Sequence, residues 1–109
     1  MVSVKFTVKV AAAALAPTVK VWIGLDVNND NAVTGSEIRP ITGDKGTFTD
    51  TFSANAAATA GLDYLVFVQA PHGSTYTIEA KDAAGKTVAS PPTGKVGTTT
   101  HAATTGLLS

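Results

Sequence analysis

Residues 64–88, YLVFVQAPHGSTYTIEAKDAAGKTV, carry the alternation of apolar and polar side chains that decides the fold. Two runs around and within this stretch, residues 62–70 and residues 75–81, have the period of two that is typical of β-strands. The first run is apolar on both faces, which predicts a central strand, and the second is apolar on one face only. The turn sequence PHGS separates the runs and the hairpin sequence DAAG follows them, so neighbouring strands are expected to be antiparallel.

The same alternation recurs in other parts of the chain. It predicts further strands at residues 2–10, 18–25, 47–52, 86–90 and 95–103. Residues 11–16 are small and form either a plain connection or one helical turn, which the proline at position 17 stops. The Ala-rich residues 53–61 are expected to form a short helix, because Ser53 can cap its start and Gly61 can end it in the left-handed conformation.

These elements predict an all-β fold, an antiparallel β-sandwich of six or seven strands with a short Ala-rich helical segment. The length of 109 residues predicts one domain, residues 1–109, in which residues 93–109 supply a last strand and a flexible tail whose Leu107 and Leu108 either dock or fray. The strand pattern of residues 64–88 resembles that of bacterial immunoglobulin-like domains. The resemblance implies an immunoglobulin-like sandwich that lacks the Cys–Trp–Cys core of antibody domains, since the chain has no cysteine.

The overall composition excludes several classes of function. Eight Lys and Arg residues balance eight Asp and Glu residues, which argues against a nucleic-acid partner and against a polybasic membrane surface. No apolar run approaches the ~18 residues of a transmembrane helix. The first 16 residues mimic a short secretion signal, but their strict alternation from Val2 to Val10 predicts a strand instead. The compartment stays unknown, and a secreted or cell-surface location is favoured.

The sharpest chemical signal is DVNNDNAVTGSE, residues 26–37. Asp26, Asn28 and Asp30 alternate, so their side-chain oxygens can turn to the same side of a loop. Calcium takes about 6–8 oxygen ligands at about 2.3–2.6 Å. The loop holds three acidic residues and no basic residue, and a divalent cation would relieve the repulsion between the carboxylates. The sequence therefore predicts a calcium ion, Ca2+, as a cofactor.

These residues resemble the 12-residue EF-hand loop, in which ligands come from positions 1, 3, 5, 7, 9 and 12. The resemblance implies six metal ligands: Asp26, Asn28, Asp30, Ala32, Thr34 and Glu37. It implies a backbone carbonyl from Ala32, a direct or water-mediated contact from Thr34, and a bidentate carboxylate from Glu37. Asn31 stands at the sixth position, where the left-handed turn usually requires Gly, and Asn is the best replacement.

The flanks of the loop differ from a helix–loop–helix. Residues 19–25 alternate as a strand entering the loop, and Pro40 prevents a long helix from leaving it. The loop therefore resembles the EF-hand-like loops that are inserted in bacterial extracellular β domains, and the ion would brace the loop. The alternative is a solvated Asn/Asp turn without an ion, because these residues are common in turns.

Other candidate residues carry weaker signals. Asp50 shares a face with Phe48 and Phe52, either as an edge residue that reaches water or as an extra partner of the calcium site. Trp22 points away from the core side of its strand, either to cover a second face of the sheet or to serve as an exposed ligand platform. His72 is expected to be solvated.

No catalytic constellation is present in the sequence. His101 is, like His72, expected to be solvated, and neither HExxH nor G-x-S-x-G occurs, so an enzyme is not predicted. The first hypothesis is a calcium-stabilised, non-catalytic binding or structural module of a bacterial surface, secreted or phage protein. The second is a metal-free structural domain that pairs with another protein, and the third is calcium-dependent binding of a glycan or lipid.

Overall fold

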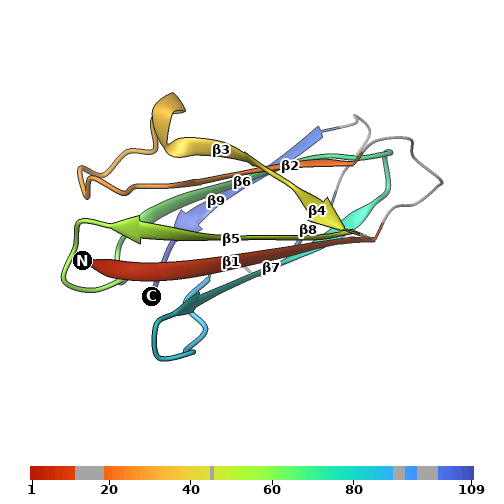
Figure 1. Cartoon of the computed structure of the whole chain (residues 1–109). Helices are drawn as coiled ribbons and strands as arrows, with labels where there is room; N and C mark the ends of the chain where they lie inside the picture. Colours follow the sequence, from red (N-terminus) through yellow and green to blue (C-terminus); the bar gives the residue numbers. More distant parts are fainter. Residues whose placement is uncertain (12–18, 45, 90–92, 96–100) are drawn as a thin grey trace.

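The structure is a computed structural model that describes residues 1–11, 19–44, 46–89, 93–95 and 101–109. Two antiparallel sheets pack face to face (Figure 1). One has the strand order β4-β5-β1-β7-β8 and the other the order β3-β2-β6-β9. The strands are β1 (Val2–Ala11), β2 (Lys20–Leu25), β3 (Ile38–Ile41), β4 (Gly43–Asp44), β5 (Thr47–Ala54), β6 (Asp63–Gln69), β7 (Thr75–Asp82), β8 (Thr93–Lys95) and β9 (His101–Leu107). The predicted all-β antiparallel sandwich is confirmed, with seven strands of at least four residues and two shorter ones, β4 and β8, among the described residues.

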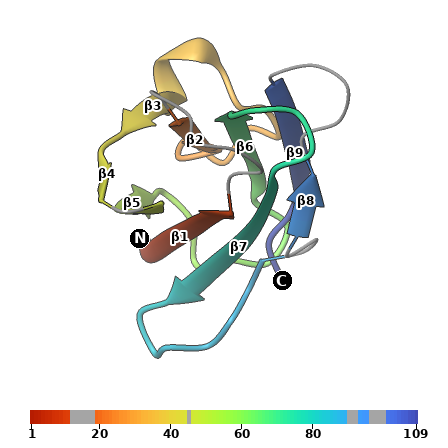
Figure 2. The ribbon, with the colours of Figure 1, turned by 90° about the vertical axis from the view of Figure 1, so that its right-hand side faces the viewer.

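The core lies between the two sheets, as the end-on view in Figure 2 shows. At its centre the ring of Phe6 meets the ring of Phe52 edge-on, with centroids 5.5 Å apart, and the ring of Tyr64 from the opposite sheet at 5.9 Å. Phe6 is fully buried and Tyr64 almost so. Burial of a large apolar side chain of this kind contributes about 1.5–3 kcal/mol, so these rings hold the sheets together.

Five predicted strands, β1, β2, β5, β6 and β7, are found within two residues of their expected bounds. β1, β6 and β7 occupy the predicted runs, and β6 lies between β2 and β9 as the doubly apolar pattern indicated. In β7 the residues Tyr76, Ile78 and Ala80 are buried, as predicted. The hairpin at residues 82–85 is also confirmed, and Gly85 has a φ of 84°. The possible helical turn at residues 11–16 lies mostly outside the described residues.

The predicted Ala-rich helix at residues 53–61 is wrong. Ser53 and Ala54 extend β5, and the rest of the segment forms bends and a turn that ends at Gly61. An isolated helix of this length is marginal because nucleation is costly. Here the backbone has tertiary partners instead: Asn55 N–H donates to the carbonyl of Val27, and Gly61 N–H donates to the carbonyl of Leu108.

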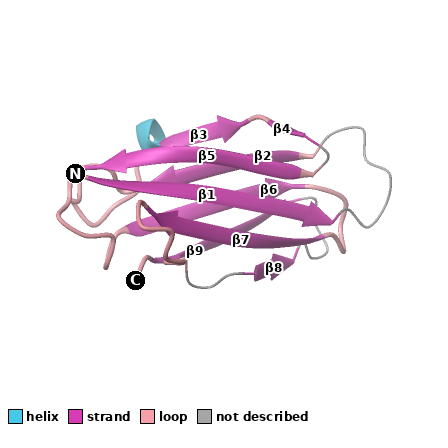
Figure 3. Cartoon of the chain, turned by 60° about the horizontal axis from the view of Figure 1, so that its bottom comes forward, coloured by secondary structure: helices cyan, strands magenta, loops and turns pink. Residues whose placement is uncertain are grey.

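The strands of the C-terminal third also differ from the prediction. Residues 86–89 make a single bridge, Lys81 with Thr87, and no strand. The last strand is β9, which pairs with β6, and the end of the chain docks, since Leu108 is buried and donates its N–H to the carbonyl of Leu62. Strand β3 was not predicted, since it contains Pro40, but it lies at a sheet edge where the missing N–H costs no ladder bond. Figure 3 shows these strands along the sandwich.

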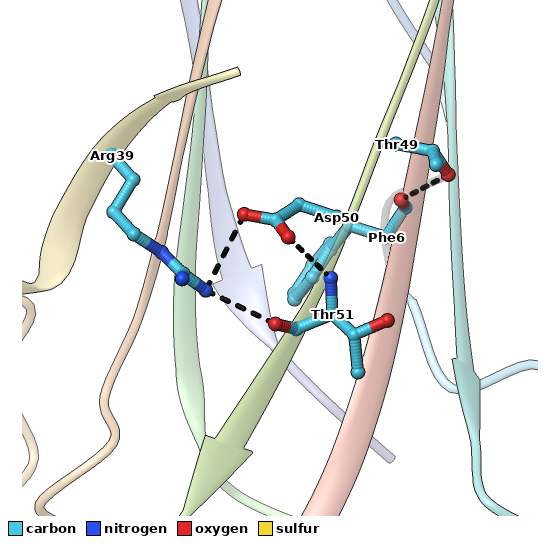
Figure 4. Close-up of polar contacts among 5 residues, drawn as sticks. All are labelled: Phe6, Arg39, Thr49, Asp50 and Thr51. Carbon is cyan, nitrogen blue, oxygen red and sulfur yellow. Dashed lines mark hydrogen bonds and ion pairs between the residues drawn. The ribbon is translucent and has the colours of Figure 1, made fainter. Parts of the chain in front are cut away.

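Arg39 closes the open side of the sandwich between β3 and β5 (Figure 4). Its guanidinium stacks 3.8 Å over the ring of Phe52, and its Nη2 donates to the carbonyl of Thr51 and lies 3.5 Å from a carboxylate oxygen of Asp50. Asp50 is therefore a partly exposed residue at the edge of its sheet, as one of its two interpretations held, and it pairs with Arg39.

Candidate metal centre

The acidic loop connects β2 to β3 at one end of the sandwich, seen at the left of Figure 1. Asp26 directly follows β2, and Glu37 ends a single 3₁₀ turn, η1 (Gly35–Glu37), directly before β3. Because β2 and β3 pair with Gly24 opposite Ile38, both acids are brought to the same end of the hairpin. The loop thus has an acidic residue at each end, Asp26 and Glu37.

Two asparagines let the loop turn sharply. Asn29 has a φ of 53° and Asn31 a φ of 66°, and both are in the left-handed region that few residues other than Gly, Asn and Asp adopt. Asn31 is the residue expected to replace the Gly of an EF-hand loop, and its expected left-handed conformation is confirmed. The turn directs the chain back toward Asp26.

Asp26 is buried and accepts hydrogen bonds from the loop that it begins. Its Oδ1 accepts from the N–H of Asp30 at 3.0 Å, and its Oδ2 accepts from the N–H of Asn31 at 2.9 Å. Burial by itself raises the pKa of Asp26, but these hydrogen bonds and the contact with the Asp30 side chain hold the pKa below its ordinary value. Asp26 is therefore ionised at neutral pH.

Glu37 is also buried and is held by more donors than Asp26. Its Oε1 accepts from the N–H of Thr34 at 2.8 Å and from the Thr34 hydroxyl at 2.9 Å. Its Oε2 accepts from the N–H of Val27 at 2.9 Å and, at 3.4 Å, from that of Asn28. Burial raises the pKa of Glu37, but the hydrogen bonds outweigh burial and the pKa is lowered.

Asp30 is exposed and lies against the other two acids. Its pKa is raised, mainly by the side-chain contact with Asp26, then by loss of hydration and by the charges of Asp26 and Glu37. Carboxylate oxygens of Asp26, Asp30 and Glu37 lie within 4.8 Å of one another. Among the described residues the ion pairs found are Arg39 with Asp50 and Lys81 with Glu79, so no basic side chain neutralises the cluster.

The structure brings together half of the six predicted ligands. The three acids meet, and Thr34 is held through its hydroxyl by Glu37. Asn28 and Ala32 are exposed, and Asn28 contacts the cluster through its backbone N–H, which donates to Glu37. The donors that the sequence analysis missed are backbone N–H groups, although Thr34 and Glu37 have the spacing of a capping box, which could have indicated the contact between them.

The loop is also anchored by apolar contacts outside the cluster. Gly24 is buried, and a Cβ at this position would lie 2.7 Å from Cγ1 of Val33 and 2.8 Å from Cγ1 of Ile38. Val33 therefore packs directly on the backbone of β2. On the other side, the carbonyl of Val27 accepts the N–H of Asn55 at 2.7 Å, which ties the loop to the end of β5.

Trp22 lies on the outer face of the four-stranded sheet. It is half-buried, and its ring meets the ring of Phe67 edge-on with centroids 5.4 Å apart. Phe67 in turn lies 5.5 Å from the ring of His101, the first residue of β9. Trp22 thus covers the outer face of β6, the first of its two interpretations.

No family model, curated protein or solved structure matches this chain. Among the described residues, no helix is long and apolar enough to cross a membrane.

Proposed function

We propose that this chain is a calcium-stabilised, non-catalytic structural or binding module, of the kind found in bacterial surface, secreted or phage proteins. The observation that carries the proposal is the group of three carboxylates, Asp26, Asp30 and Glu37, with oxygens within 4.8 Å of one another. Oxygens that ligate one calcium ion at about 2.3–2.6 Å lie at most about 5 Å apart, so this spacing suits a single ion.

The donor set also fits calcium in its chemistry. A carboxylate has about four lone-pair positions, and the hydrogen bonds to Asp26 described above leave part of this capacity for a cation. Glu37 is more fully occupied, and the 3.4 Å contact with Asn28 is the weakest bond that it would exchange for an ion. In the proposed site the remaining oxygens come from the Asn28 side chain, the Ala32 carbonyl and Thr34.

The ion would brace the loop. Asp26 follows β2 and Glu37 precedes β3, so an ion held by both would join the two ends of the loop and offset the negative charge that the three carboxylates bring together. At a calcium concentration 100 times the dissociation constant, binding to the folded state alone adds about 2.7 kcal/mol to stability.

Isothermal titration of chelator-treated protein with calcium tests the proposal. We expect one ion per chain, a higher melting temperature in calcium than in EDTA, and loss of both effects in Asp26→Asn. The matched control is Asp82→Asn, because the Asp82 carboxylate also accepts two backbone N–H bonds but belongs to no acidic cluster among the described residues. A melting temperature that is equal in calcium and EDTA would exclude a tight site.

A metal-free structural domain is the second candidate function, and one observation favours it. Glu37 accepts hydrogen bonds from three backbone N–H groups and one hydroxyl of its own loop, so it can order the loop without an ion. A calcium titration that releases or absorbs no heat of binding, together with a stable fold in EDTA, would select this candidate. The two candidates therefore differ in a single measurement.

The finer fold assignment that we propose is immunoglobulin-like. The order β3-β2-β6-β9 is that of strands C′-C-F-G in such domains, and β5-β1 corresponds to E-B. In place of the first strand, A, this chain has β7, which arrives after β6. An experimental structure whose strands keep this order would support the assignment, and a different pairing of β6 and β9 would contradict it.

A further inference from the structure

A pocket of about 400 Å³ lies on the outer face of the four-stranded sheet, beside the acidic loop. Leu65 of β6 and residues 105–107 of β9 line one part of the pocket, and residues 31–33 of the loop line another. Asp63, the first residue of β6, also lines it, at the end of the sandwich that carries the loop (Figure 1). Ligand pockets have volumes of about 300–1,000 Å³, so this one can take a small molecule or a side chain of a partner.

Asp63 brings a carboxylate without a partner to this pocket. The buried positions of β6 alternate with Asp63 and Leu65, so these two side chains are on the outer face of the sheet. The Asp63 carboxylate makes no hydrogen bond and no ion pair with any residue that the structure describes. The described residues that line the pocket include no Lys or Arg, so one negative charge is left uncompensated there.

Apolar side chains lie directly beside this carboxylate. Leu107 is paired with Asp63 across the β6–β9 ladder, and directly opposed residues have Cβ atoms about 4.5–5.5 Å apart. Leu65 follows on the same face of β6, about 6.5 Å further along the strand. Leu107 is 55% exposed, and besides Met1 it is the only large apolar side chain so exposed in the described residues. A free carboxylate therefore adjoins an apolar surface that these residues leave open.

The acidic loop forms a wall of the pocket that the chain itself holds in place. Asn31 N–H donates to Oδ2 of Asp26 at 2.9 Å, and Val33 packs on the backbone of Gly24. Asp26 N–H donates to the carbonyl of Asp63 at 2.9 Å, which ties the start of the loop to β6. Because these contacts are made within the chain, the shape of the pocket does not depend on the proposed calcium site.

We propose that this pocket binds the side chain of a lysine presented by a partner protein. The ammonium of that lysine would lie on the Asp63 carboxylate, and its four-carbon stem would lie over Leu65 and Leu107. Lysine joins a compact charge with three N–H donors to a flexible aliphatic stem, and such stems bury along apolar surface. Charge complementarity therefore selects the ammonium, and the two exposed leucines select the stem.

The same lining is unsuited to other classes of ligand. Nucleobases stack on aromatic side chains and arginine gains from aromatic faces, but the aromatic residue of the lining, Tyr64, is 1% exposed and belongs to the core. An anion would be repelled by Asp63. A calcium ion takes about 6–8 oxygen ligands, and Asp63 is the single acidic residue among the described residues of the lining. A cation on an aliphatic stem is the ligand that fits.

NMR titration of the isotope-labelled chain with the peptide acetyl-Gly-Lys-Gly-amide tests the proposal, both in EDTA and in calcium. In both buffers we expect saturable shifts of the amide signals of Asp63, Leu65, Thr105 and Leu107. The same peptide acetylated on the lysine Nζ keeps the stem but loses the charge, so it should bind about tenfold more weakly. The free diamine cadaverine is titrated in parallel and should bind more weakly than the lysine peptide.

Asp63→Asn removes the charge but keeps the backbone bond to Asp26, so we expect it to weaken binding of the lysine peptide about tenfold. The matched control is Glu79→Gln, which removes one negative charge from the exposed face of β7 and should bind as the wild type does. Equal binding of the two peptides, no saturable shift, or tighter binding of cadaverine would overturn the proposal. Shifts that calcium abolishes would place the lysine on the acidic loop and also overturn it. The peptide comparison uses the wild-type chain, so it decides even if a variant fails to fold.

Discussion

Two aspartate-led loops lie at the same end of the sandwich, and they use their carboxylates differently (Figure 1). In the hairpin after β7, Oδ1 of Asp82 accepts the N–H groups of Ala84 and Lys86, both at 2.9 Å, and the carboxylate is partly exposed. In the loop after β2, Asp26 does the same for two N–H groups, but it is buried and stands beside two further acids.

The comparison shows how many carboxylates a tight turn requires. One carboxylate that accepts two backbone N–H groups is sufficient to order a tight turn, as Asp82 shows. Asp30 is less necessary to the turn, because its carboxylate is exposed and its pKa is raised, first by the contact with the Asp26 side chain and then by lost hydration and the charges of Asp26 and Glu37. Three acids within 4.8 Å are therefore more negative charge than the turn needs, which is why a cation is the proposed explanation.

Lowering the pH is expected to have the largest effect on the stability of the acidic loop, because it protonates Asp26 and Glu37 together. Both have a lowered folded-state pKa, so the stability they contribute is fully present above their ordinary values of 3.8 and 4.5 and is lost as the pH falls through the folded values. Urea unfolding in EDTA at a series of pH values measures this loss. A free energy of unfolding that stays constant below pH 4.5 would contradict it.

Asp26→Asn should destabilise the protein more than the equivalent substitution in the other loop, Asp82→Asn. In saturating calcium we expect it to lower the free energy of unfolding by about 3 kcal/mol, from loss of the ion and of charge-assisted hydrogen bonds. For Asp82→Asn we expect about 1 kcal/mol, because solvent can replace the lost contacts. Chemical denaturation of both variants checks the difference, and equal losses would mean that Asp26 is only a turn residue.

Glu37→Gln tests the second buried acid. The amide keeps one acceptor oxygen but turns its NH2 toward N–H groups that Glu37 now accepts, so we expect a loss of about 2 kcal/mol even in EDTA. Glu79→Gln on the exposed face of β7 is the control and should change stability little. The same denaturation curves in EDTA measure both, and an unchanged Glu37→Gln would show that the ring of donors is not stabilising.

Gly24→Ala tests how firmly the loop is seated on β2. The new Cβ would lie within 3 Å of side-chain atoms of Val33 and Ile38, so the loop must shift, at a cost of about 1–3 kcal/mol. Gly35→Ala is the control, because nothing lies within 4 Å of its Cβ position. Thermal melts compare the two, and we also expect weaker calcium binding for Gly24→Ala alone.

Asp30→Asn should have the smallest effect on the fold and the most informative sign. Because its pKa is raised by its neighbours, removing its charge should slightly stabilise the protein in EDTA and weaken calcium binding. Paired melts in EDTA and in calcium would reveal this reversal. Destabilisation in both buffers would mean that Asp30 holds the loop rather than an ion.

Local pattern was sufficient for much of this structure. The period of two in β1, β6 and β7 follows from which side chains each face buries, and it can be recognised without knowing the neighbouring strands. The left-handed conformation of Asn31 and the grouping of three acids in one loop also follow from residue type and spacing. These features depend on a few adjacent residues, so the sequence by itself determined them.

Non-local pairing decided the rest. The Ala-rich segment has helical propensity, but Val27 and Leu108 accept its N–H groups, and β3 forms despite Pro40 because it lies at an edge. The donors that fill the Glu37 carboxylate, and the bond from Ser109 N–H to the carbonyl of Val88, likewise depend on which segments meet in the fold. A backbone group has the same chemistry in every residue, so only the tertiary structure could decide which of them would be paired and which left open.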